Sequence, residues 1–494
     1  MPALTQRSDL IKSFSGKDLI RCFADCAGNA AQIVLFFRHS YSIIATVIVL
    51  AVAAALGGCA NAVAAAASEH ASRPADPDRI AQTSGVSLRP DGSVRRPIDA
   101  VLRAALRSVP VEQLAGQLLI VGVEERGTGR ALPALDDAAR AMLGRVQPAG
   151  VVLFGRSFVT VDQTLALVAE IHALSGLPPI IATDYEGGVV ARLTDTGGIP
   201  ATRIPAARTV GELYASGRVD GYAVRALGSV MGRELRALGV TMNFAPVVDV
   251  DPRGELGALG RQRRTFGDDP AVVARIASEL VIGMQSQGVA AVVKHFPGHG
   301  AVAGDSHFVL PELFADRELL EARELAAFAD AFSADPIGLM TAHIVVPALA
   351  GNRTPATISH AVLTGLARER FGFDGLIITD ALNMRALAGL GSEADLAVAA
   401  IAAGADLLLK PIDPVAVHRA VVDAVSDGTI PRSRLEDSVA RVMRAKNRIG
   451  LLPVVPFGPS VVPTDRVAAA ATLGSEEHRA IVARFSPTDA GAGE

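Results

Sequence analysis

The densest group of ionisable side chains lies between Lys294 and His307, in a segment that reads KHFPGHG and then, after four residues, DSH. It holds three histidines, one lysine and one aspartate within fourteen residues. Asp305 stands two residues before His307, and a carboxylate beside an imidazole fixes its tautomer and stabilises its protonated form. The pair is a candidate general acid/base near neutral pH. Three glycines predict a loop that moves between solvent and the site: Gly298, Gly300 and Gly304.

The three histidines also raise the alternative of a zinc site. Their HxxxH…H spacing is compatible with one, but the glycines between them impose no fixed geometry and Lys294 would repel a cation. A solvated loop is a second alternative, and it hardly explains so dense a cluster. The only cysteines are Cys22, Cys26 and Cys59, so the rest of the chain has no disulfide and no cysteine metal site. We therefore expect neither a metal nor a cofactor.

Further ionisable residues end or follow short apolar runs. Asp184 follows PPIIAT, Lys294 and His295 end GVAAVV, His343 ends GLMTA, and Asp380 follows GLIIT. A charged residue at the end of a strand is often merely solvated. In a parallel barrel, however, the carboxyl ends of all strands meet on one face, where they form a shared polar pocket.

The elements that must position these residues are eight short apolar runs with helix-like stretches between them, such as 162–174, 271–287 and 318–334. Continuous apolar runs fit strands that are buried on both faces. Eight of them favour an α/β fold of the (β/α)₈ TIM-barrel type, as a single catalytic domain over 98–452. An open doubly wound sheet is the alternative. The runs cover Gln117–Val123, Gly150–Phe154, Pro179–Thr183, Thr241–Val248, Ala290–Lys294, Gly338–His343, Leu376–Thr379 and Asp406–Leu409.

Four segments, in order along the chain, resemble glycoside hydrolase family 3 in its bacterial β-N-acetylglucosaminidase branch. They are DYEGG at 184–188, RTFG at 264–267, KHFPGHG with DSH at 294–307, and TDALNM at 379–384. The similarity is clear from about 184 to 410 and weaker from about 110 to 450. One such motif is weak, but four in the family's order, each at an expected strand end or following loop, are specific.

The resemblance implies a retaining double displacement on β-linked N-acetylglucosamine. Asp380 matches the nucleophile that forms a covalent glycosyl-enzyme. His307, supported by Asp305, matches the group that protonates the leaving oxygen and then activates water. Glycosidases more commonly use two carboxylates for this work. A neutral His does not repel an anionic acceptor, so phosphorolysis stays open beside hydrolysis, which we rank first.

The resemblance also implies a set of sugar-binding residues: Asp184, Arg192, Arg264, Lys294 and His295. An exposed helix charge is the alternative for Arg192. Three positions depart from the family, in ways that concern the aglycone side of the substrate. Tyr185 and Val189 stand where Gln and Arg are frequent, and Lys410 stands where Met is common. His299 and His343 are expected to structure the pocket.

The implied activity is an exo-acting β-N-acetylglucosaminidase that releases N-acetylglucosamine from cell-wall, peptidoglycan-derived glycans. The nearest rivals are a family 3 β-glucosidase or xylosidase and an N-acetylglucosaminide phosphorylase. The first commonly has a second domain, for which too few residues follow the barrel. A different class is a non-catalytic sugar-binding lipoprotein, which loss of the nucleophile would favour, but Asp380 is present.

The N-terminal region predicts export and a lipid anchor. The uncharged apolar stretch Ile43–Leu56 has the length of a signal peptide's apolar core and ends in Leu-Gly-Gly-Cys, which resembles a lipobox with Cys59 as the acylated residue. We expect residues 1–59 to be an extension and signal peptide, 60–97 a flexible tether and 453–494 a loose tail. An ordinary signal peptide or an uncleaved anchor is the alternative, and the roughly forty residues before the apolar stretch are unusually many.

Composition limits the partners. The net charge of −4 indicates no nucleic-acid surface, which needs a basic face. The chain has no tryptophan, so we expect hydrogen bonds rather than ring stacking to hold the sugar. We expect a monomer that contacts the membrane through its lipid and faces the cell wall or periplasm.

Overall fold

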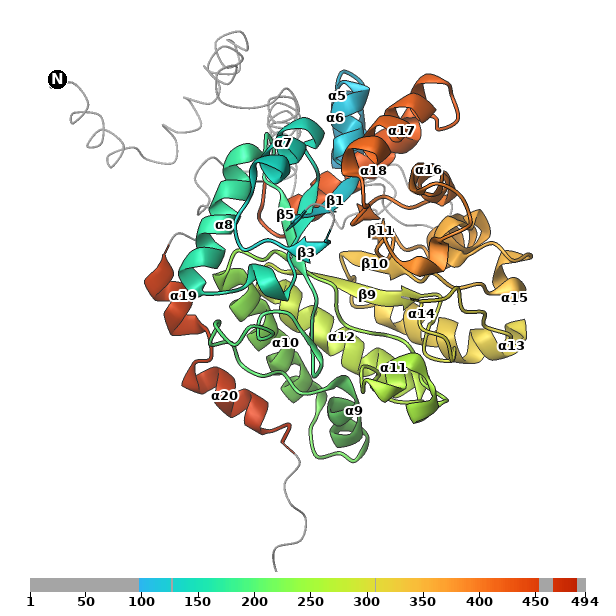
Figure 1. The fold of residues 1–494 in the computed structure, drawn as a ribbon. Coiled ribbons are helices and arrows are strands. Elements are labelled where there is room, and N and C mark those ends of the chain that lie inside the picture. The colour runs from blue at the N-terminus through green and yellow to red at the C-terminus, as the bar shows by residue number, and fades with distance from the viewer. Residues whose placement is uncertain (1–96, 126–127, 307, 453–464, 487–494) are drawn as a thin grey trace, which may run out of the picture.

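The computed structural model describes residues 97–125, 128–306, 308–452 and 465–486. Eight parallel strands form a barrel at the centre of the molecule, with helices around it (Figure 1). The strands are β1 (Leu119–Gly122), β4 (Gly150–Val152), β5 (Ile180–Thr183), β8 (Met242–Asn243), β9 (Ala290–Phe296), β10 (Gly338–Thr341), β11 (Leu376–Ile378) and β12 (Leu408–Leu409).

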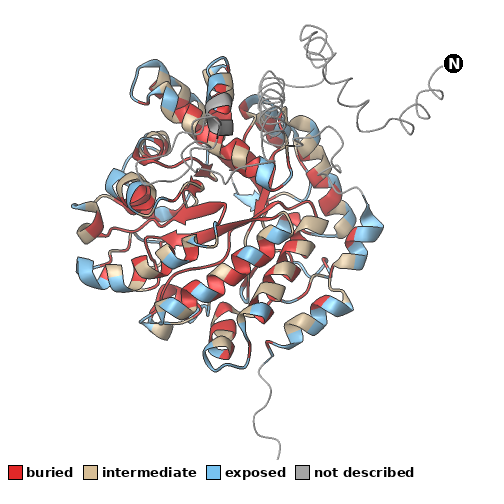
Figure 2. Ribbon diagram, turned by 180° about the vertical axis from the view of Figure 1, so that it is seen from behind, coloured by how far each residue is buried: buried red, intermediate tan, exposed pale blue. Residues whose placement is uncertain are grey.

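Each strand pairs with its neighbour in the order β1, β4, β5, β8, β9, β10, β11, β12, and β12 pairs with β1. An isolated parallel bridge between Ile378 and Leu407 joins β11 to β12 and closes the ring. Every expected strand therefore exists, and the barrel rather than the open sheet is confirmed. The strands are buried on both faces, whereas the helices are buried only on their inner sides (Figure 2).

The helices that surround the barrel begin at residues suited to capping. Thr160 caps α8 in a capping box, and Asp269 caps α12, whose first residue is proline. The longer helices are α5 (Pro97–Leu106), α7 (Asp137–Val146), α8 (Val161–Leu174), α9 (Ala207–Ala215), α10 (Gly221–Ala237), α12 (Pro270–Ser286), α16 (Glu393–Ala403), α17 (Pro414–Ser426) and α18 (Arg432–Arg448). The shorter ones are α6 (Val111–Gly116), α11 (Ala258–Arg261), α13 (Arg317–Leu320), α14 (Ala326–Phe332) and α15 (Pro347–Ala350).

The helix expected over 318–334 is interrupted. A π-helical segment, η4 (Glu321–Leu325), separates α13 from α14, and a second π-helix, η6 (Ala361–Arg370), lies between β10 and β11. Two short hairpins stand at the barrel mouth: β2 (Glu124–Glu125) with β3 (Arg130–Ala131), and β6 (Tyr185–Gly187) with β7 (Val190–Ala191). Among the described residues, no helix has the length and apolar character needed to cross a membrane.

The end of the chain corrects one expectation. The tail expected to be loose contains α19 (Arg466–Thr472) and α20 (Glu476–Ala483), which pack against the outside of the barrel at α8 and α10 (Figure 1). Leu473 and Phe485 are buried there, and the His478 imidazole lies 3.0 Å from the buried carboxylate of Glu234 on α10. Composition suggested a loose tail, but a few spaced apolar residues suffice to dock a short helix. The expected signal peptide and the expected tether up to residue 96 lie outside the described residues, and Pro97 begins α5.

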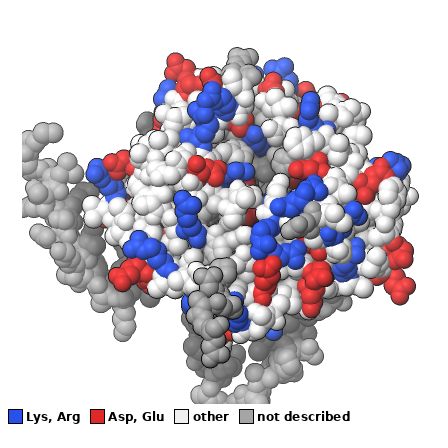
Figure 3. Space-filling view, turned by 60° about the horizontal axis from the view of Figure 1, so that its bottom comes forward, with Lys and Arg blue, Asp and Glu red and all other residues white. Residues whose placement is uncertain are grey.

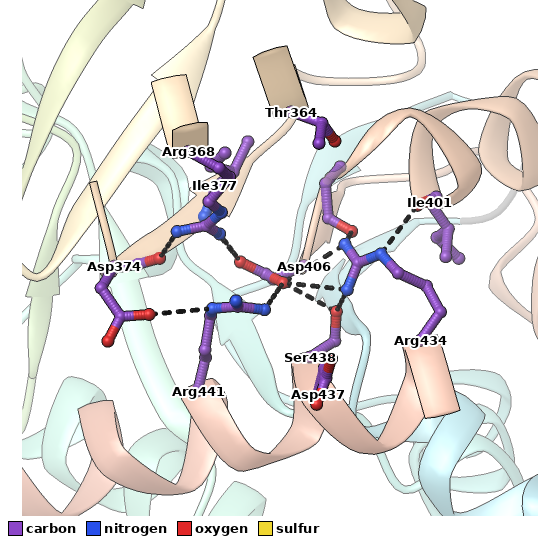
Figure 4. A network of polar contacts seen from close by, with 12 residues as sticks. Thr364, Arg368, Asp374, Ile377, Ile401, Asp406, Arg434, Asp437, Ser438 and Arg441 are labelled. Carbon is purple, nitrogen blue, oxygen red and sulfur yellow. Dashed lines mark hydrogen bonds and ion pairs between the residues drawn. The ribbon is translucent and has the colours of Figure 1, made fainter. Parts of the chain in front are cut away.

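A buried ion network ties the last strand to the last barrel helix (Figure 4). Asp406, just before β12, pairs with Arg368 of η6 and lies 3.3 Å from guanidinium nitrogens of both Arg434 and Arg441 on α18. It also accepts the backbone N–H of Ile377 at 3.0 Å. Burial disfavours the charged carboxyl, but the arginines outweigh burial and hold the Asp406 pKa well below its ordinary value. The network thus stabilises the place where the barrel closes.

Candidate active site

The candidate nucleophile follows β11 at the barrel mouth. The Asp380 carboxylate accepts the backbone N–H of Ala381 at 2.7 Å. His343, at the end of β10, contacts the Ala381 carbonyl through Nε2 at 3.1 Å and Thr357 through Nδ1 at 2.8 Å. This agrees with the expected structuring role of His343. Burial disfavours the charged form of Asp380, but the charges of His343 and His295 outweigh burial and lower its pKa. Asp380 is therefore a carboxylate at neutral pH, as a nucleophile must be.

Four charged side chains from separate strands and loops meet beside it. The Lys294 ammonium, at the end of β9, lies 2.8 Å from Asp184 and 2.6 Å from Glu186. The Arg264 guanidinium donates two hydrogen bonds of 2.8 Å to the Glu186 carboxylate. Lys294 is almost fully buried, and so is the Glu186 side chain. Two cations and two carboxylates thus neutralise each other, as burial requires.

The pKa shifts in this cluster follow from its charges. Burial favours the neutral form of Glu186, but Arg264 and Lys294 outweigh burial and lower the Glu186 pKa strongly. Burial likewise disfavours charged Lys294, but Asp184 and Glu186 raise the Lys294 pKa. Glu186, Arg264 and Lys294 therefore remain charged at neutral pH. They present fixed donors and acceptors of the kind that bind sugar hydroxyls by directional hydrogen bonds.

A second carboxylate, Asp249, organises the histidine-rich segment. It lies 2.7 Å from Nδ1 of His295 and accepts the backbone N–H of His299 at 2.6 Å. It is fully buried, and the nearby histidines outweigh the cost of burial and keep its pKa low. Burial, followed by the charge of His295, lowers the His299 pKa to about 4. His299 is thus neutral at pH 7, and its Nε2 contacts the Ser306 hydroxyl at 3.0 Å.

The loop that carries the expected acid/base contacts the segment that follows the candidate nucleophile. The Ser306 carbonyl accepts the backbone N–H of Ala386 at 3.3 Å, and Asp305 is partly buried beside it. His307 lies outside the described residues, as does the expected lipidation residue Cys59. Their roles, and the pairing of Asp305 with His307, stay predictions.

Arg192 is the remaining expected binding residue. Its backbone N–H donates to the Asp184 carbonyl at 3.1 Å, and one guanidinium nitrogen lies 3.2 Å from Asp195. Its Nε is buried and has no hydrogen-bond partner among the described residues. A buried donor without a partner is costly unless a ligand satisfies it. Arg192 lies in a turn rather than on a helix, and its sugar-binding role stays a prediction.

The structure therefore brings Asp184, Arg264, Lys294, His295 and Asp380 to one face of the barrel, with Arg192 beside Asp184. Sequence reasoning missed Glu186 and Asp249 as members of the site. Both carried a usable signal, because Glu186 lies two residues after Asp184 and Asp249 directly follows the expected strand Thr241–Val248. Tyr185, which stands where Gln is frequent in the family, is buried away from the cluster. Its hydroxyl donates to the Thr202 carbonyl at 2.5 Å. In the described part of the chain, no three His, Cys, Asp or Glu residues form a group suited to hold a metal ion.

Residues 111–445 match the family model described as the glycosyl hydrolase family 3 N terminal domain. The chain belongs to glycosyl hydrolase family 3. It is thus a glycoside hydrolase, and the residues matched by the family model cover the eight strands of the barrel. A relative named beta-hexosaminidase from Thioalkalivibrio sulfidiphilus is 38% identical over 326 residues, which are 64% of this chain and 87% of that protein.

Two solved structures resemble this family 3 hydrolase. A glycoside hydrolase family 3 β-N-acetylglucosaminidase from Paenibacillus sp. str. FPU-7 has 33% sequence identity and a TM-score of 0.67, covering 76% of this chain and 68% of that one. A β-N-acetylhexosaminidase from Beutenbergia cavernae DSM 12333 has 30% identity and a TM-score of 0.62, covering 69% of this chain and 99% of that one.

Proposed function

We propose that this family 3 hydrolase is a retaining, exo-acting β-N-acetylglucosaminidase that releases N-acetylglucosamine from cell-wall, peptidoglycan-derived glycans. The observation that carries the proposal is a charged Asp380 facing the same barrel mouth as the buried Asp184, Glu186, Lys294 and Arg264 cluster. The names of the similar proteins support the choice of sugar.

In the first step, a carboxylate oxygen of Asp380 attacks the anomeric carbon. The bond to the leaving oxygen breaks as His307 gives that oxygen a proton, and a glycosyl ester of Asp380 forms. In the second step, His307 takes a proton from water, the water oxygen attacks the same carbon, and the ester bond breaks. Two displacements restore the β configuration.

The sugar-binding groups support action at a chain end. Lys294 and Glu186 are almost fully buried, so they close the inner side of the site. A sugar whose hydroxyls contact them has no room there for a further residue of the glycan. We infer that one terminal sugar is removed in each reaction.

The anchor belongs to the same proposal. The run that ends in Cys59 supports export and acylation, which would hold the enzyme at the membrane and facing the cell wall or periplasm.

The experiment is to incubate the purified chain with 4-nitrophenyl β-N-acetylglucosaminide and with 4-nitrophenyl β-glucoside, each with and without inorganic phosphate. We expect cleavage of the first substrate, free N-acetylglucosamine as product and little effect of phosphate. Faster cleavage of the glucoside would identify a β-glucosidase, and a sugar 1-phosphate product would identify a phosphorylase. Sugar binding without cleavage would identify the non-catalytic class. Each of these three results would refute the proposal.

A further inference from the structure

A cavity of about 360 Å³ opens at the barrel mouth where β12, β1 and β4 end, on a different sector from the sugar-binding cluster. Its volume is in the range of small-molecule sites. None of the expected catalytic or sugar-binding residues lines it. Its principal side chains are Glu124, Arg130, Phe154, Arg156, Asp195 and Lys410. We propose that this cavity is a subsite for a carboxylate carried by the substrate's leaving group, an inference that rests on the proposed function.

The cavity borders the candidate active site on two sides. Lys410 directly follows β12, the neighbour of the strand that leads to Asp380, and the backbone N–H of Leu382 donates to the Leu409 carbonyl at 2.9 Å. On the other side, Asp195 lines the cavity and lies 3.2 Å from the Arg192 guanidinium. A group that extends past the anomeric carbon can thus reach the cavity.

The direction of the substrate follows from the order of the strands. The hydroxyl-binding cluster stands at the ends of β5 and β9 and on the loop that carries Arg264, whereas Asp380 follows β11. A sugar held by the cluster therefore presents its anomeric carbon to Asp380. The leaving group departs from the opposite face of that carbon, and the cavity at the mouth beside β12, β1 and β4 is within reach of a leaving group that extends from there.

The charges of the cavity select an anion. Glu124 is neutralised by Lys410 at 2.8 Å, and Asp195 by Arg192. Arg130 and Arg156 are exposed, and within the described residues neither has an ion pair. Two guanidinium groups thus remain for a ligand, and guanidinium matches a carboxylate with two parallel hydrogen bonds.

Lys410 is held rigidly as part of this wall. Its ammonium lies 4.9 Å from the centre of the Phe154 ring as well as against Glu124. At Gly155, an added Cβ would come within 2.4 Å of the Asp195 carboxylate, so glycine allows Asp195 its place in the wall. Lys410, which stands where Met is common in the family, thus forms part of the wall of this cavity.

Inorganic phosphate, acting as the acceptor of the sugar, is the other anion that the Arg130 and Arg156 guanidiniums could bind. An acceptor must contact the anomeric carbon on the face opposite its ester bond to Asp380. None of the sugar-binding residues expected around that carbon lines the cavity, so the cavity lies next to the reacting position rather than over it. A carboxylate on the leaving group needs no contact with the reacting carbon, so the geometry favours it.

The test compares two substrates that differ by one carboxylate: 4-nitrophenyl and 3-carboxy-4-nitrophenyl β-N-acetylglucosaminide. The double variant Arg130→Gln/Arg156→Gln removes both unpaired guanidiniums, and Arg419→Gln removes an exposed arginine on α17 as the matched control. We expect the double variant to lower kcat/KM for the carboxylated substrate about tenfold more than for the neutral one. The control should leave the ratio of the two values unchanged.

An unchanged ratio in the double variant, or equal losses on both substrates, would overturn the proposal. So would phosphate-dependent formation of a sugar 1-phosphate that the double variant abolishes, because that result assigns the cavity to an acceptor. If the wild type cleaves neither substrate, the proposed function fails. The cavity is then tested by calorimetric titration with 5-hydroxy-2-nitrobenzoate, whose binding must weaken in the double variant and not in the control.

Discussion

Single residues decide the chemistry here through the charges that surround them. Asp380 is charged because nearby histidines outweigh the cost of its burial, so its pKa lies below the ordinary 3.8. The nucleophile therefore stays charged as the pH falls from 7 to about 4. An acidic loss of rate above pH 4 must come from another group.

Replacing the nucleophile tests this view. Asp380→Ala should lower kcat by several powers of ten and leave the thermal midpoint close to that of the wild type, because covalent catalysis is removed while the fold is kept. Steady-state rates and a melting curve check both parts. Near wild-type turnover would eliminate the assignment.

Substrates whose leaving groups differ in acidity test the assignment of His307 as the acid/base. His307→Ala should slow poor leaving groups most, because a good one such as dinitrophenolate needs little protonation. Breakdown of the glycosyl ester then limits turnover, and azide, which needs no general base, should restore the rate. Asp305→Ala should show a milder form of the same pattern. Equal slowing of all substrates without azide rescue would make His307 a binding or structural residue.

At the scale of elements, the barrel depends on how its last strand and helices are attached. Asp406 sits before β12 and is surrounded by Arg368, Arg434 and Arg441, so removing its charge leaves buried cations without a partner.

Asp406→Asn should cost about 3–5 kcal/mol of the free energy of unfolding at pH 7, and should lower the melting temperature by roughly 5 °C. The folded pKa of Asp406 is below its unfolded value, so this stabilisation is complete above about pH 4 and is lost as the pH falls further. The difference between wild type and variant should therefore shrink at pH 3. Asp335→Asn, which alters an exposed pair with Arg448, is the control and should change the stability by less than about 1 kcal/mol.

The two C-terminal helices give a second test at this scale. Phe485→Ala removes a buried ring after α20 and should cost about 3–5 kcal/mol. Val467→Ala, on the exposed side of α19, should cost less than about 0.5 kcal/mol. Chemical unfolding measures both. Equal, negligible losses would mean that the helices contribute nothing to stability.

At the scale of the whole molecule, the question is where the barrel resides. The face shown in Figure 3 mixes Lys and Arg with Asp and Glu and shows no broad patch of one sign. Any attachment to a membrane is therefore expected from the N-terminal region rather than from this face.

Cys59→Ala should release the protein from membranes or stop its processing, because two acyl chains supply enough buried CH₂ groups for stable attachment. Cys26→Ala is the control, since that residue would be removed with the signal peptide. Detergent phase partitioning and the size of the mature chain report the outcome. A Cys59→Ala protein that matures normally and stays equally membrane-bound would argue against lipidation.

The barrel and most of the candidate site could be predicted from local patterns in the sequence. Buried parallel strands are short continuous apolar runs, and that signal is local, so all eight were recognisable. The residues at the ends of those runs then marked Asp184, Lys294, His295 and Asp380.

Which of these residues contact one another depends on how the strands pack around the ring. Lys294 and Asp184 are 110 positions apart, and their contact exists because β5 and β9 end on the same face of a closed ring. The docked helices α19 and α20, the support that Asp249 gives His295, and the cavity beside Lys410 have the same origin. Each depends on the packing of segments distant in the chain, which no local pattern of residue types records.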